Sequence, residues 1–222
     1  MKGAALAQRA GARHAIQYRK ESKVVIALER RLYYNPYKSE FDEVTMVIII
    51  TGASHVGKTL LAQRMLEKYK YPYLSIDHLK MGLIRSGNTD LTPEDDNELT
   101  DYLWPIVQEM IKTVIENEQN LIVEGCYIPF HWRTGFDAQY LQSIRFICLA
   151  MSDEYIDSHF EEIKAHASDI ETRMDDSCYT ADQLKQYNRQ IIAGFMSAGE
   201  RIDLITERYE DLILFFSQLR IV

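Results

Sequence analysis

A glycine-rich stretch between residues 52 and 59 carries the clearest chemical signal in the sequence. It fits the pattern G-x-x-x-x-G-K-[ST] at every fixed position. The glycines allow backbone N–H groups to converge on a phosphate, and the positive end of a following helix adds to the attraction. In this pattern Lys58 reaches the β and γ phosphates, and Thr59 offers an oxygen to Mg²⁺. We therefore predict that ATP and Mg²⁺ are bound here, with nucleotide contacts from Gly52, Ala53, Ser54, His55, Val56, Gly57, Lys58, Thr59 and Leu60.

Two carboxylates follow apolar segments that have the composition of buried strands. Asp77 comes directly after residues 71–76, and Glu124 directly after residues 121–123. Open α/β sheets bind their ligands at the carboxyl ends of the strands, so both acids are candidate site residues. The alternative for Asp77 is that it caps a helix over residues 79–84. The alternative for Glu124 is a carboxylate that faces bulk water.

The elements that must position these residues alternate between strand and helix. The stretch VTMVIIIT is apolar on both faces and β-branched, which indicates a strand buried in a parallel sheet. Helical segments separate it from four further candidate strands, which predicts an α/β domain with a five-stranded parallel sheet and helices on both faces. The predicted strands are residues 44–51, 71–76, 121–123, 144–150 and 201–205.

Two helix starts are signalled by capping residues. Thr92, followed by Pro93 and Asp95, predicts the start of a long helix that Pro105 should kink or split. Thr180 with Gln183 predicts a second start. Between a helix that begins near residue 153 and this second start lies a polar stretch, and we interpret residues 166–180 as a lid.

Composition places the chain among globular proteins. Its 222 residues are 46% hydrophobic and 26% charged. No apolar stretch approaches the ~20 residues that a membrane-spanning helix needs. The three cysteines form no C-x-x-C pair and the six histidines show no paired spacing, which argues against a disulfide framework or a zinc site. We therefore expect a cytoplasmic protein without a membrane partner.

Charge is unevenly distributed along the sequence. The net charge is −8, but residues 1–45 contain nine Lys/Arg against five Asp/Glu, so the remainder carries −12. This excess of negative charge repels a phosphate backbone, so we expect no nucleic-acid partner. We expect the folded core to span residues 46–222, with residues 1–45 as a basic arm that is either appended or an artefact of gene-start assignment.

The glycine-rich motif and the layout after it resemble a known class. The GTPase motifs D-x-x-G and N-K-x-D are absent, and the chain is short for a motor ATPase. From Met46 to the C-terminus the sequence resembles the small-molecule and nucleotide kinases of the P-loop class, the adenylate-kinase-like group. Residues 46–85 also resemble bacterial 2-phosphoglycerate kinases and nucleoside- or nucleotide-type kinases. The resemblance implies a three-layer P-loop kinase fold with a helical lid, and Mg²⁺-dependent transfer of the ATP γ-phosphate to a small hydroxyl- or phosphate-bearing acceptor.

The resemblance also implies roles for individual residues. Asp77 would orient or deprotonate the acceptor hydroxyl, and Glu124 would bind Mg²⁺ through water, although the family more often has Asp there. Gly125 would let the substrate approach the backbone. Further cations are expected near the acceptor or the phosphates: Lys80, Arg85 and Arg133 on the acceptor side, and Arg173 and Arg189 from the lid. The polar stretch is acidic, unlike the arginine-rich lids of nucleotide kinases, which weighs against a nucleoside monophosphate acceptor.

Two other functions remain open from the sequence. One is a regulator that binds ATP without an acceptor, and the other is a toxin-like kinase of metabolites. The acceptor, the choice between ATP and GTP, and the oligomeric state are not specified by any motif.

Overall fold

The sheet is built around strand β1 (Val47–Gly52), whose first four residues have no exposed surface. A strand covered on both faces requires neighbours on both edges and helices on both sides. β1 pairs in parallel with β3 (Leu121–Glu124) on one edge and with β4 (Ile144–Met151) on the other. Its aliphatic, β-branched residues therefore form the centre of the fold.

All five strands of the sheet run parallel. β2 (Tyr73–Ser75) pairs with β3 and β5 (Asp203–Ile205) with β4, which gives the order β2-β3-β1-β4-β5. The predicted α/β class with a five-stranded parallel sheet is confirmed, and each strand begins within three residues of its predicted start. The strand order changes direction at β1, so its carboxyl end opens where a doubly wound sheet binds ligands.

The structure is a computed structural model that describes residues 45–165 and 180–218. Nearly all of the predicted arm (residues 1–45) and of the predicted lid (residues 166–180), including Arg173, lies outside the described residues.

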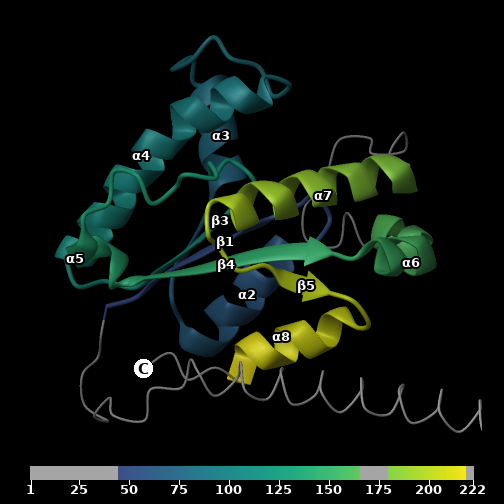
Figure 1. Ribbon diagram of the computed structural model, residues 1–222. Coiled ribbons are helices and arrows are strands. Elements are labelled where there is room, and N and C mark those ends of the chain that lie inside the picture. Colours follow the sequence, from purple (N-terminus) through teal and green to yellow (C-terminus); the bar gives the residue numbers. More distant parts are fainter. Residues whose placement is uncertain (1–44, 166–179, 219–222) are drawn as a thin grey trace, which may run out of the picture. The chain divides into compact units, whose positions relative to one another are not determined.

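Helices cover both faces of the sheet (Figure 1). One core joins the odd-numbered β1 residues, such as Ile49, to α3, α4 and the end of α7, and the other joins Ile48 and Ile50 to α2 and α8. None of the described helices is long and apolar enough to cross a membrane. The helices are α2 (Lys58–Tyr69), α3 (Ile76–Arg85), α4 (Asp96–Glu116), α5 (Ala138–Leu141), α6 (Asp153–Ala165), α7 (Ala181–Ser197) and α8 (Tyr209–Gln218).

The long helix α4 starts later than predicted, and it continues through Pro105. Thr92 and Asp95 do bond to each other, with the Thr92 amide donating to the Asp95 carboxylate at 2.8 Å, but they close a turn and the helix begins at Asp96. Pro105 lies inside one helix of 21 residues and does not split it. Leu103 and Val107 on either side are fully buried while Pro105 is exposed, so packing holds the helix together across the missing hydrogen bond.

The start of α7 follows its prediction. The Thr180 side chain accepts a hydrogen bond from the Gln183 amide, and the Gln183 side chain accepts one from the Thr180 amide at 2.9 Å. This capping box satisfies two N–H groups at the helix start and fixes where α7 begins.

We expect replacement of Pro105 with Ala to stabilise the protein by about 1–3 kcal/mol, because it restores an interior helix hydrogen bond at an exposed position. Denaturant unfolding measures the change. Pro93→Ala is the control, since Pro93 lies in the turn before α4, where the same substitution restores no helical bond. A Pro105→Ala protein that is less stable than wild type would contradict this account of α4.

Candidate functional site

The end of β1 is pressed against the backbone of β4. Gly52 has a φ of 140°, and a Cβ at this position would lie 2.0 Å from the Leu149 carbonyl oxygen, so only glycine fits. The next amide, that of Ala53, donates to the same oxygen at 3.2 Å. The Ala53 N–H is therefore engaged in the sheet, and the predicted contact of Ala53 with nucleotide stays a prediction.

Lys58 closes the glycine-rich loop from inside. Its ammonium donates to the Ala53 carbonyl at 2.7 Å, and the residue is only 6% exposed. It is also the first residue of α2, whose first turn contains no acidic side chain. A nearly buried cation at the positive end of a helix is electrostatically unfavourable alone and is stabilised by an anion. The loop therefore has the charge pattern of an anion site.

Thr59 and Glu124, the two residues predicted to bind the metal, come together from separate elements. Glu124 ends β3, aligned with Ile50 of β1, and is 1% exposed. The Thr59 hydroxyl donates to its carboxylate at 3.4 Å. A hydroxyl beside a carboxylate is a set of hard oxygen donors, which suits Mg²⁺. The residues present therefore fit the ion that the motif implies.

Tyr209, the first residue of α8, holds the loop from outside. Its hydroxyl donates to the Gly57 carbonyl at 2.6 Å, and that carbonyl also accepts the Leu61 amide at 2.9 Å. Gly57 has a φ of 77°, and a Cβ there would lie 2.2 Å from the Tyr209 hydroxyl. Burial raises the pKa of Tyr209, which keeps the hydroxyl a donor. The sequence contains no signal for this contact, because 152 residues separate the partners.

Asp77 lies at the carboxyl end of β2, but it is not a helix cap. Helix α3 begins at Ile76 with Ser75 as its N-cap, so Asp77 is already in the first turn. Its carboxylate pairs with Lys80 at 3.0 Å, one turn further along the same helix. Arg85 is exposed at the other end of α3, roughly 12 Å along the axis from Asp77. The structure therefore brings Lys80 to Asp77, but not Arg85.

Gly125 has a packing reason to be glycine. A Cβ at this position would lie 2.9 Å from the Cβ of Ile76, the first residue of α3. The missing side chain thus lets the end of β3 approach α3. The expected approach of substrate to Gly125 stays a prediction.

Arg133, in the segment after β3, pairs with Glu200, which follows α7. Its guanidinium donates to both carboxylate oxygens of Glu200, at 3.0 Å for Nη2 to Oε2, and lies 4.6 Å over the ring of Trp132. Glu200 lies in the connection between α7 and β5, three residues before the start of β5. The pairing raises the pKa of Arg133. Arg133 would have to leave Glu200 to bind an acceptor, and the expectation that it does so stays a prediction.

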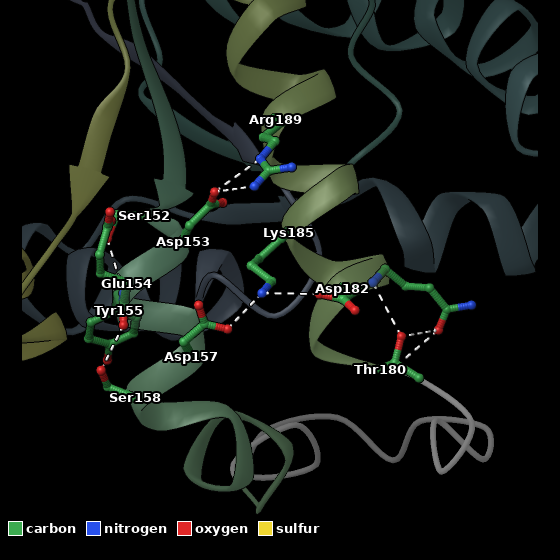
Figure 2. A network of polar contacts seen from close by, with 11 residues as sticks. Ser152, Asp153, Glu154, Tyr155, Asp157, Ser158, Thr180, Asp182, Lys185 and Arg189 are labelled. Carbon is green, nitrogen blue, oxygen red and sulfur yellow. Dashed lines mark hydrogen bonds and ion pairs between the residues drawn. The ribbon is translucent and has the colours of Figure 1, made fainter.

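Arg189 lies at the carboxyl edge, paired with Asp153. Figure 2 shows it pointing from α7 to the start of α6, where its Nε donates to the Asp153 carboxylate at 3.0 Å. This hydrogen bond raises the pKa of Arg189. One residue earlier, the buried Asn188 accepts the amide of Met151 at 2.8 Å, which ties α7 to the end of β4. Asn188 is a structural residue that no sequence pattern indicated.

Comparison with known proteins finds solved structures whose backbone follows a similar path. No protein-family model matches the sequence, and no curated protein matches it. Among solved structures, the chain is similar to a sugar kinase from a Janibacter species, with 18% identity, a TM-score of 0.45, and coverage of 78% of this chain and 92% of that one. It is also similar to a gluconokinase from Sinorhizobium meliloti, with 13% identity, a TM-score of 0.42, and coverage of 80% of this chain and 100% of that one. A third similar structure is a shikimate kinase from Bacteroides thetaiotaomicron, with 14% identity, a TM-score of 0.46, and coverage of 78% of this chain and 97% of that one.

We expect Tyr209→Phe to loosen the glycine-rich loop, because the Gly57 carbonyl loses one of its two donors. The free energy of unfolding should fall by about 1 kcal/mol, and the affinity for ATP should fall several-fold. Calorimetric ATP titration and denaturant unfolding measure the two effects. Tyr102→Phe removes a tyrosine hydrogen bond to a carbonyl elsewhere, that of Asn88, and is the control for ATP affinity. Equal ATP affinity in both variants and wild type would remove Tyr209 from the site.

Proposed function

We propose that this chain is an ATP-dependent phosphotransferase that moves the γ-phosphoryl group to a small metabolite. The observation that carries the proposal is the nearly buried Lys58 ammonium, held inside a glycine-rich loop at the positive end of α2. No carboxylate in the first turn of the helix compensates this charge. A triphosphate would compensate it, with the loop amides and the helix start as further donors.

Thr59 and Glu124 would hold Mg²⁺, the metal that the loop pattern implies. When bound, the ion neutralises charge on the phosphate oxygens. Glu124 is suited to this role because its carboxylate is buried beside the Thr59 hydroxyl, where a cation is electrostatically favoured.

Phosphoryl transfer requires mainly that the reactants are positioned and that the developing charge is stabilised. Lys58 would leave the Ala53 carbonyl and bind a phosphate oxygen. Its ammonium would stabilise the negative charge that develops on that oxygen. Asp77 would accept a hydrogen bond from the acceptor hydroxyl and take its proton. The bond from that oxygen to the γ-phosphorus forms as the bond to the bridging oxygen breaks, and ADP leaves. Arg189 would approach the phosphates only by leaving Asp153, and Arg173 is proposed from the sequence alone.

We expect Lys58→Ala to lower the rate of phosphoryl transfer by about 10²-fold or more, because it removes the cation nearest the transferred group. A coupled assay of ADP release measures the rate. Lys68→Ala, at the exposed end of the same helix, is the matched control and should leave the rate unchanged. Normal ATP binding and turnover in the Lys58→Ala protein would refute the proposed function.

We expect Asp77→Asn to slow transfer by about 10²–10⁴-fold, because the amide keeps the size of the side chain but cannot accept the proton. ATP affinity should change little. The transfer rate, ATP affinity and melting temperature are measured together, with Asp90→Asn in the loop after α3 as a control for the loss of one charge. Unchanged transfer would remove Asp77 from the site, and a parallel loss of ATP affinity would move it to the nucleotide side.

A further inference from the structure

The carboxyl ends of β2 and β3 carry a polar cluster whose charge distinguishes classes of acceptor. The cluster consists of Ser75, Asp77, Lys80, Asp96 and Tyr127. We infer that it binds an acceptor that is uncharged or carries an amine, and that it excludes phosphorylated and carboxylated compounds. The inference rests on the proposed function and narrows the acceptor class of that same site.

The one cation of the cluster is already neutralised. The Lys80 ammonium lies 3.0 Å from the Asp77 carboxylate, and it donates to the Tyr127 hydroxyl at 2.8 Å. It also lies 4.8 Å from the centre of the Tyr127 ring. The Lys80 side chain is 11% exposed, against 39% for Asp77. An incoming ligand therefore meets the carboxylate of Asp77 before it meets the ammonium.

A second carboxylate extends the acidic surface. Asp96, in the exposed first turn of α4, accepts a hydrogen bond from the Tyr127 hydroxyl through Oδ1 at 3.1 Å. Burial, and then the charges of Asp77 and Asp96, raise the pKa of Tyr127, so its hydroxyl stays neutral. Two carboxylates and one ammonium give the cluster a net charge of −1.

The cluster also contains a buried hydroxyl, that of Ser75. Ser75 is 2% exposed, and its Oγ has no hydrogen-bond partner among residues 45–165 and 180–218. It is aligned with Glu124 across the β2–β3 pair and lies two residues before Asp77. A buried polar group without a partner is rare in a folded protein, and a hydroxyl can both donate to and accept from a ligand hydroxyl.

Among the described residues, the arginines expected near the acceptor and the phosphates are engaged or distant. Arg133 is bound to Glu200, and Arg189 to Asp153. Within the described part of the chain, no cation besides Lys80 contacts the cluster. Exposed carboxylates accept hydrogen bonds from hydroxyl or ammonium groups and repel phosphate and carboxylate groups. The cluster thus matches a polyol, a sugar or an amino sugar.

The test measures ADP release by the full-length protein with ATP and Mg²⁺ across three matched sets of hydroxyl compounds. The sets are neutral sugars and cyclitols, amino sugars, and the corresponding sugar phosphates and sugar acids together with 2-phosphoglycerate. We expect a neutral or amine-bearing compound to raise ADP release at least about tenfold above background, and more than any anionic counterpart. A stronger response to an anionic compound overturns the inference, and so does a lack of response to every neutral and amine-bearing compound.

Variants then test the residues with the best acceptor from this panel. Asp96→Asn should raise KM about tenfold for an amine-bearing acceptor, the loss expected for one charged hydrogen bond, and several-fold for a neutral one. Ser75→Ala should raise KM several-fold, and in both variants the KM for ATP should stay the same. Asp101→Asn removes the same charge from α4 about 140° around the helix and is the control. An unchanged acceptor KM in both cluster variants overturns the assignment of the subsite.

Failure of the inference and failure of the proposed function give different results. A protein that binds ATP through Lys58 and phosphorylates only anionic compounds keeps the proposed function and overturns the acceptor class. A protein whose ATP binding is insensitive to Lys58→Ala refutes both.

Discussion

The contact between the end of β1 and the backbone of β4 is the constraint on which the candidate site depends. Because Gly52 has no side chain, the two strands stay close enough for the Leu149 carbonyl to accept the Ala53 amide. That bond fixes where the chain leaves the sheet and turns the Ala53 carbonyl toward Lys58. The burial of β1 on both faces holds the rest of the strand in register. The position of the lysine is thus set by packing in the sheet, rather than by the loop alone.

The same register places the acid beside the loop. β3 pairs with β1 so that Glu124 is aligned with Ile50, and β2 pairs with β3 so that Ser75 is aligned with Glu124. In a parallel sheet the carboxyl ends of neighbouring strands meet at one edge. Strand pairing therefore places Glu124 beside Ser75 and within reach of Thr59, although 65 residues separate Thr59 from Glu124.

Local sequence patterns predicted the features that depend on interactions within a few residues. Apolar β-branched runs gave the five strands, and Thr180 with Gln183 gave the start of α7, because burial and capping act within a few residues. The patterns failed where distant packing decides. Pro105 does not split α4, because the buried residues on either side of it hold the helix together, and Asp77 lies inside a helix that starts earlier than its cap signal indicated.

Charged partners were the least predictable part of the site. The sequence indicates neither pairing: Arg133 is held by Glu200, 67 residues away, and Arg189 by Asp153 across 36 residues. An arginine in a sequence carries no information on which carboxylate it will face after folding. Lys80 and Arg85 were both expected on the acceptor side, but α3 directs only Lys80 to Asp77, because residues three apart lie on one face of a helix.

The nucleotide side and the acceptor side of the site are built from different parts of the sheet. The loop is held by β4 and by Tyr209 of α8, whereas the acceptor cluster is held by α3, α4 and the segment after β3. They meet at the β1–β3 pair, where Glu124 lies between Thr59 and Ser75. Substitutions at Asp96 or Lys80 thus touch none of the bonds that shape the loop. Because of this division, the charge of the acceptor cluster can change without disturbing phosphate binding. The class of acceptor therefore depends on the residues of the cluster, and not on the glycine-rich loop.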